Sequence, residues 1–162
     1  MNRRDPPRPG TEQDMLLGFL QYERDSLLWK LDGLDEEQLR QAHPPSNLTL
    51  LGLVKHLTDV ERTWFHARFA GQVDMGAWDP ERHWRIEPDE TSAGLIAGYR
   101  SACAESDRIV REHALGDLAA GAPPHRAGVT LGWILIHMVQ ETARHVGHAD
   151  LIRERIDGAT GT

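Results

Sequence analysis

Four long stretches of this 162-residue chain repeat apolar side chains every three or four positions, which is the spacing of one face of an α-helix. No stretch shows the sustained alternation of apolar and polar residues that is typical of a half-buried strand. Glycines and prolines separate the four stretches. The predicted helices cover about residues 11–32, 49–70, 92–113 and 130–156. Together they predict an all-α protein that folds as a four-helix bundle.

The connections between these helices carry signals of their own. Asp35 and Gln38 have the spacing of a capping box, so we expect a short helical turn directly after the first helix. Residues 72–90 combine prolines with Trp78 and Trp84 and have no clean period. We therefore predict a long crossover loop between the second and third helices, and long loops in compact domains often carry function.

The size and composition of the chain fit one globular domain. Hydrophobic residues make up 40% of the chain and charged residues 27%, as in a soluble protein. We predict a single domain over residues 11–158, preceded by a flexible lead over 1–10 and followed by a short tail over 159–162.

Charge and hydropathy exclude several classes of partner. The chain has 18 basic and 25 acidic residues, a net charge of −7, and no dense basic run, so we expect no nucleic-acid partner. The first ten residues hold three arginines and three prolines without an apolar segment, unlike a secretory signal. No stretch approaches the roughly 20 apolar residues that span a bilayer. We therefore expect a cytoplasmic protein without a membrane partner.

The predicted fourth helix departs from ordinary core patterning. On a helix of about 100° per residue, Glu141, His145 and His148 all fall within about 80° of His137. Apolar residues occupy the two ends of the same stripe, which places these polar side chains on the face that points into the bundle. A buried carboxylate is costly unless it is paired or coordinates an ion. This stripe is therefore the first candidate for a functional site.

A metal ion is one explanation for this stripe. Glu141 and His145 are four residues apart, so they lie one turn apart on the same face and can both bind one ion. His56, in an apolar stripe of the predicted second helix, can supply a third ligand, with Lys55 and Asp59 turned away. Three protein ligands leave a coordination position open for water or substrate, as in catalytic sites. Imidazole with one carboxylate suits zinc, iron(II), nickel or manganese.

Simpler interpretations of the same residues remain open. A histidine on an apolar helix face, such as His56, is more often a hydrogen-bonded core residue than a ligand. The cluster on the fourth helix can also be a polar network bonded to Tyr99, Arg144 or buried water. Cys103 is the only cysteine, which excludes a cysteine-rich metal site, and we expect it to be a core residue rather than a nucleophile. The five tryptophans are expected to serve packing.

Two passages of the sequence resemble a known family. The first is LLGLVKHL at 50–57 followed by DVER at 59–62, and the second is HMVQETARHVGHAD at 137–150. Both are similar to the DinB/YfiT-like superfamily of metal-dependent enzymes, and more narrowly to its actinobacterial-type branch. The resemblance extends over roughly residues 11–158, and the second passage is its most specific part.

The resemblance implies a four-helix bundle with a long crossover between the second and third helices, a homodimer, and a divalent metal held by His56, Glu141 and His145. Zinc is the first candidate metal, with nickel, iron or manganese as the others. The commonest pattern in the superfamily has three histidines, and Glu141 at the middle position instead resembles mycothiol-dependent maleylpyruvate isomerases and mycothiol transferases. His148 and His137 are the candidate catalytic residues, as contacts to the substrate or to the ligands.

The implied activity is the transfer of a low-molecular-weight thiol such as mycothiol to a small electrophile, with the metal lowering the pKa of the thiol. The isomerase type carries a further C-terminal domain that a chain of this length lacks, so we favour a transferase. Two other functions can use the same residues. One is metal-dependent hydrolysis with His148 or His137 as the base. The other is a non-enzymatic, stress-related metal-binding module.

Overall fold

The computed structural model describes residues 5–6, 9–72, 82–122 and 127–160. Every regular element in these parts of the chain is a helix, which confirms the predicted all-α class. The elements are α1 (Glu12–Leu31), α2 (Glu36–Arg40), α3 (Leu50–Glu61), the π-helix η1 (Arg62–Phe69), α4 (Ser92–Arg111) and α5 (Leu131–Asp157). None of these described helices is both long and apolar enough to cross a membrane.

Parts of three predicted segments lie outside the described residues. They are most of the lead over 1–10, the last two residues of the tail over 159–162, and residues 73–81 of the crossover loop, which include Trp78. The described end of the crossover loop, residues 82–90, is the part that bears on the site below.

The helices begin where local signals in the sequence place them. Thr11 and Asp14 form a capping box: the Thr11 hydroxyl accepts from the Asp14 backbone N–H at 3.1 Å, and the Asp14 carboxylate accepts from the Thr11 backbone N–H at 3.0 Å. The predicted box of Asp35 and Gln38 begins α2 in the same way. Because such contacts are local, the predicted starts of the four long helices agree with the structure to within one residue.

The second long helix changes its winding, which the periodicity did not predict. The sequence predicts one α-helix over 49–70, but the structure ends α3 at Glu61 and continues as the π-helix η1. The Ala70 backbone N–H donates to the carbonyl oxygen of Phe65, five residues earlier, at 2.9 Å. No glycine or proline marks the change, and η1 packs against both α4 and α5.

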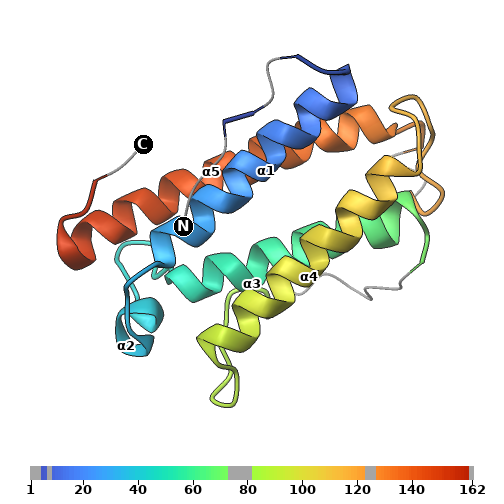
Figure 1. The fold of residues 1–162 in the computed structure, drawn as a ribbon. Helices are drawn as coiled ribbons and strands as arrows, with labels where there is room; N and C mark the ends of the chain where they lie inside the picture. Colours follow the sequence, from blue (N-terminus) through green and yellow to red (C-terminus); the bar gives the residue numbers. More distant parts are fainter. Residues whose placement is uncertain (1–4, 7–8, 73–81, 123–126, 161–162) are drawn as a thin grey trace.

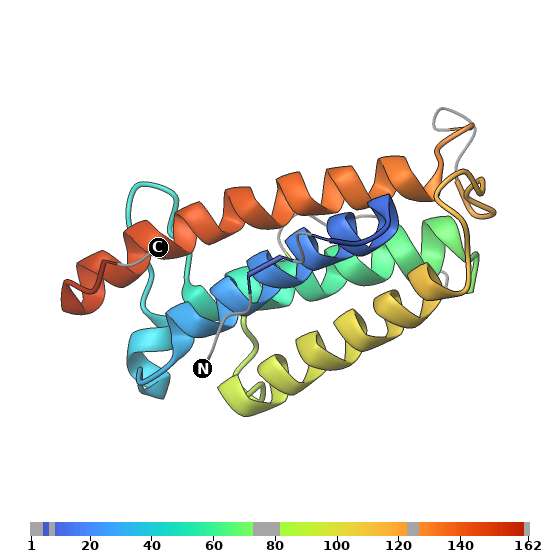
Figure 2. The same ribbon diagram turned by 45° about the horizontal axis from the view of Figure 1, so that its top comes forward.

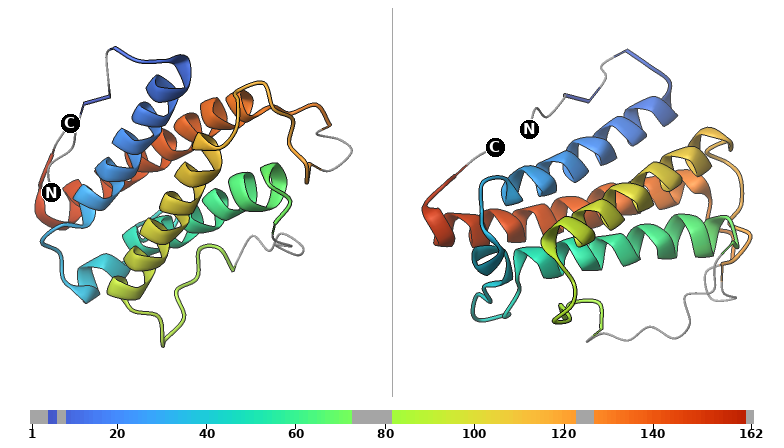
Figure 3. Two further views of the ribbon diagram at one scale, coloured as in Figure 1. Left: turned by 45° about the vertical axis from the view of Figure 1, so that its right-hand side comes forward. Right: turned by 60° about the horizontal axis from the view of Figure 1, so that its bottom comes forward.

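The long helices pack as two parallel pairs (Figure 1). α1 lies along α5, α3 with η1 lies along α4, and α3 also contacts α5. The helices of one pair run in the same direction, and the two pairs run in opposite directions (Figure 2). As a result η1 ends at the opposite end of the molecule from the start of α4 (Figure 3). The contact between α3 and α5 is the one that brings the candidate ligands together.

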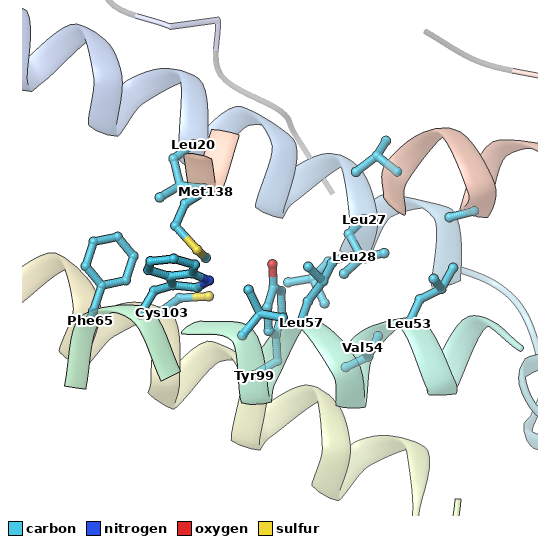
Figure 4. Packing of buried hydrophobic residues seen from close by; sticks show 14 of the residues in the cluster. Leu20, Leu27, Leu28, Leu53, Val54, Leu57, Phe65, Tyr99, Cys103 and Met138 are labelled. Carbon is cyan, nitrogen blue, oxygen red and sulfur yellow. The ribbon is translucent and has the colours of Figure 1, made fainter. Parts of the chain in front are cut away.

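Buried aliphatic and aromatic side chains fill the space between the pairs (Figure 4). Leu20 and Leu27 of α1, Leu57 of α3 and Met138 of α5 are each at most 1% exposed. Burying a side chain of this size contributes roughly 1.5–3 kcal/mol, so this core supplies most of the stability. Cys103 of α4 belongs to the same cluster and is buried, as predicted.

The buried side chain of Arg24 links three of the helices through ion pairs. The Arg24 guanidinium of α1 donates to both carboxylate oxygens of Glu61 of α3, at 2.7 and 2.8 Å, and to Asp107 of α4 at 2.7 Å. Arg24 and Glu61 are each 1% exposed. No pairing among these three residues was predicted, because each is an ordinary charged residue in its own helix.

Candidate metal centre

His56, Glu141 and His145 meet where α3 contacts α5. His56 lies in the middle of α3, between the buried residues Leu53 and Val60 at helical spacing, so its side chain faces the inside of the molecule. Glu141 and His145 lie four residues apart on α5, and His145 is 7% exposed. The structure therefore brings together the three residues that were expected as metal ligands.

The spacing of the three side chains fits a divalent ion. Oε1 of Glu141 lies 3.5 Å from Nε2 of His56 and 3.2 Å from Nε2 of His145. One ligand atom from each of the three residues lies within 4.8 Å of the other two. Metal–ligand bonds of about 2.0–2.1 Å in a tetrahedral zinc site separate neighbouring ligand atoms by about 3.3 Å. The two distances from the Glu141 oxygen to the imidazole nitrogens are close to this separation.

The charge states of Glu141 and His56 also suit an ion. Hydrogen bonds from the imidazoles of His145 and His56 hold the pKa of the Glu141 carboxyl well below its usual range. Burial is the main reason that the pKa of His56 is lowered from its ordinary value. At neutral pH, Glu141 is therefore ionised and His56 is neutral. These are the forms in which a carboxylate and an imidazole bind a metal.

His148 contacts the other edge of the His145 ring. The Nδ1 atoms of the two residues are 3.4 Å apart, while Nε2 of His145 faces Glu141. An imidazole that binds a metal through one nitrogen keeps a proton on the other, and a neighbouring acceptor then orients the ring. The structure places His148 where it can be that acceptor for His145.

His137 lies in an aromatic cluster one turn before Glu141. Its ring centroid is 4.4 Å from that of Trp64 and 5.3 Å from that of Trp133, and its plane is within 14° of the Trp133 plane. The cluster joins η1 to the N-terminal part of α5. His137 therefore lies beside the triad along α5, next to two indoles.

The described end of the predicted crossover loop lies against the candidate ligands. The indole of Trp84 stacks on the imidazole of His56, with centroids 4.0 Å apart and planes 11° apart. The Trp84 ring is also 5.5 Å from the ring of His145. Trp84 was expected to serve packing, and its position on His56 was not predicted, because the segment around it has no period that relates it to α3.

Two residues that flank His56 hold this segment in place. Lys55 donates through Nζ to the Arg85 carbonyl oxygen at 2.8 Å and to the Glu90 carboxylate at 2.7 Å. The Asp59 carboxylate lies 2.6 Å from Nδ1 of His83. Lys55 and Asp59 were expected to turn away from the apolar stripe, and from there they reach residues 83–90. The charged residues on each side of His56 could have signalled such contacts. No local pattern in the sequence, however, identifies their partners in residues 83–90.

Cys103, Tyr99 and Arg144 were considered as a possible nucleophile or as members of a polar network. None of the three joins the triad. Burial raises the pKa of the Cys103 thiol and that of the Tyr99 hydroxyl, and the charged groups that act on both are Arg24 and Glu61. Arg144 is exposed on α5. Cys103 is therefore a protonated core thiol at neutral pH, and a network through Tyr99 or Arg144 gains no support.

The comparison with known proteins agrees with the resemblance read from residues 50–62 and 137–150. The model of a family described as mycothiol-S-transferase matches residues 15–158, a range that includes His56, Glu141 and His145. No curated protein matches the chain. Because the family match runs from within α1 to the end of α5 and includes the whole triad, the chain belongs to the mycothiol S-transferase family.

Proposed function

We propose that this protein is a divalent-metal-dependent S-transferase that joins a low-molecular-weight thiol such as mycothiol to a small electrophile. The observation that carries the proposal is the spacing of His56, Glu141 and His145 in a chain of the mycothiol S-transferase family. In the reaction a sulfur–carbon bond forms and the bond from carbon to the leaving group breaks. The thiol proton is released and balances the charge of the leaving group.

The triad would hold the metal, with zinc as the first candidate and nickel, iron or manganese as the others. A divalent metal bound there would supply a lower pKa for the thiol of the cosubstrate. An ionised Glu141 and a neutral His56 are the forms that bind such a metal, which supports this chemistry. Trp84 covers one face of the His56 ring and so restricts the orientations that this imidazole can take.

His148 and His137 are proposed to assist from outside the ligand set. Nδ1 of His148 would accept the Nδ1 proton of His145, which leaves the His148 proton on Nε2. From there His148 can donate a hydrogen bond to a bound substrate. His137, next to Trp64 and Trp133, is the proposed second contact to the substrate.

We also propose a fold type, a domain range and an oligomeric state for this protein. The two parallel pairs of helices and the position of residues 82–90 against α3 support a DinB-type four-helix bundle with residues 72–90 as its crossover. We further propose a single domain over 11–158 and a cytoplasmic homodimer without a nucleic-acid or membrane partner. The dimer is proposed from the resemblance to DinB-like proteins.

Product formation should require both the metal and the thiol. With metal-loaded protein, mycothiol and monobromobimane, thioether fluorescence is expected to rise about tenfold or more above the uncatalysed rate. Omitting mycothiol or removing the metal with a chelator should abolish the difference. Turnover of electrophiles without any thiol would instead favour the metal-dependent hydrolase. Failure with a broad panel of thiols and electrophiles, despite full metal content, would favour the non-enzymatic module.

Replacing His148 by alanine is expected to leave most of the metal bound but to lower kcat/KM about ten- to a hundredfold, because residues that orient a ligand typically contribute this much. Metal content is measured by elemental analysis, and activity by thioether formation. Arg144→Ala, an exposed position on the same helix, is the control. A loss of metal as large as that caused by His145→Ala would make His148 a ligand and contradict this role.

A further inference from the structure

Residues 82–90 lie against α3 beside the triad, and we call them the crossover strap. Figure 3 shows the strap leading into α4. From the strap, the indole of Trp84 reaches the imidazole of His56, with ring centroids 4.0 Å apart and planes 11° apart. The centroid of the Trp84 ring also lies 5.5 Å from that of His145. One side chain of the strap is therefore adjacent to both histidines of the triad.

Side chains of α3 hold the strap at both of its ends. Nζ of Lys55 donates to the Glu90 carboxylate at 2.7 Å, and this carboxylate also accepts the Glu87 backbone N–H at 2.7 Å. At the other end, the Asp59 carboxylate lies 2.6 Å from Nδ1 of His83. Lys55 and Asp59 are four residues apart on α3, so they lie on one face of that helix. The position of the strap is therefore set by residues that are not members of the triad.

A glycine lets the backbone of the strap approach α3 closely. Gly52 lies one turn before His56, and a Cβ atom at Gly52 would lie 3.0 Å from the Trp84 carbonyl oxygen. The same Cβ would lie 2.9 Å from Oγ1 of Thr49, which caps α3. Any side chain at this position would have to displace these atoms. The strap therefore packs on α3 where a glycine is needed, although glycine in a helix is usually about 0.5–1 kcal/mol less favourable than alanine.

The stacked indole limits how the His56 ring can turn. The χ2 torsion of histidine has broad energy minima, so an imidazole depends on its neighbours to fix the plane of its ring. The indole lies nearly parallel to this ring, and a ring turned out of that plane would collide with it. Functional groups of a site must be held within about 0.5 Å and 10–20° of their working geometry. Nε2 of His56 lies 3.5 Å from Oε1 of Glu141, so rotation of the ring changes this spacing directly.

We propose that Trp84 is a positioning residue for His56, and that the crossover strap, held by Lys55 and Asp59, thereby raises the affinity of the triad for a divalent metal. The inference rests on the metal site of the proposed function. It adds to that site a set of residues that are not ligands and that act through the plane of one imidazole.

The position of the His56 ring can be measured in the metal-free protein. In the NMR spectrum of protein with labelled histidines, the ring current of Trp84 should shift the His56 ring protons upfield. The His56 signals are those missing from His56→Gln. Trp84→Leu should abolish the upfield shift, and Lys55→Met should reduce it. Trp29→Leu, which removes another half-buried indole in α1, should leave it unchanged. An unchanged shift in Trp84→Leu would overturn the stacking of the two rings.

Metal affinity tests whether this position matters. In competition with a zinc chelator, Trp84→Leu is expected to bind Zn²⁺ about tenfold more weakly than the wild type, the lower end of the usual cost of losing a residue that orients a ligand. Trp84→Phe keeps a ring that can stack on His56 and should retain most of the affinity. Trp29→Leu should bind as the wild type does. Affinity in Trp84→Phe as low as in Trp84→Leu would contradict a role through stacking.

Lys55→Met distinguishes positioning from charge. Removing a positive charge close to a cation site strengthens cation binding if charge alone acts. If Lys55 acts through the strap, Zn²⁺ binding should instead weaken about threefold or more. In the Trp84→Leu background the same change should cause no further loss, because the side chain through which it acts is absent. Equal or tighter binding by Lys55→Met would overturn the role of Lys55 as an anchor.

The outcomes separate this inference from the proposed function. If the wild type binds no divalent metal, both fail. If the wild type binds Zn²⁺ and Trp84→Leu binds it equally tightly, the positioning role fails and the proposed function stands. If Trp84→Leu and Lys55→Met both weaken binding but no thiol-dependent turnover is found, the positioning role stands and the S-transferase activity fails.

Discussion

Replacing His145 by alanine is expected to weaken binding of a divalent metal about a hundredfold. Structural zinc sites with four ligands gain roughly 10–16 kcal/mol, or about 3 kcal/mol per ligand, which corresponds to about a hundredfold in affinity. His145 is buried, and its Nε2 lies 3.2 Å from the Glu141 carboxylate, so its loss removes one of the three groups that face the ion. Elemental analysis after dialysis and competition with a chelator of known affinity measure the change.

Two further variants make this experiment specific. Glu141→Gln keeps the size of the side chain and removes its charge, so it should also weaken metal binding strongly. His113→Ala removes an exposed histidine that follows α4, outside the triad, and should leave the metal content unchanged. Equal metal content in the wild type and in His145→Ala would contradict the assignment of the triad.

Replacing Arg24 by methionine is expected to lower the free energy of unfolding by about 3–5 kcal/mol, the usual cost of removing one partner of a buried ion pair. Glu61 is 1% exposed and would keep a buried negative charge without the guanidinium that now binds both of its oxygens. Asp107 is less affected because it is nearer the surface, at 18% exposed. Urea denaturation followed by circular dichroism gives the free energy of unfolding.

The double variant Arg24→Met with Glu61→Leu separates the charge effect from simple loss of packing. Because it removes both buried charges, it should recover most of the stability lost in the single variant. Arg108→Met breaks exposed ion pairs with Glu105 and Glu112 and should leave the free energy of unfolding nearly unchanged. If the double variant is no more stable than Arg24→Met, the buried charge of Glu61 is not the cause of the lost stability.

The helices and half of the site could be predicted from the sequence, because the signals for both are local. The capping boxes at Thr11 and Asp35 depend on residues three positions apart, and they begin helices at the predicted places. Glu141 and His145 share a face because four residues make about one turn of any α-helix. Their pairing therefore did not depend on how α5 packs.

The rest of the site was decided by the tertiary structure. Periodicity placed His56 on an inward face, but only the contact between α3 and α5 brings it within 3.5 Å of Glu141. Trp84 reaches His56 from a segment without a helical period, so no local pattern relates the two residues. Likewise Arg24 and Glu61 are 37 positions apart. A helical pattern in the sequence predicts which face of a helix is buried. Which residues of another helix lie against that face depends on packing between segments that are distant in the chain.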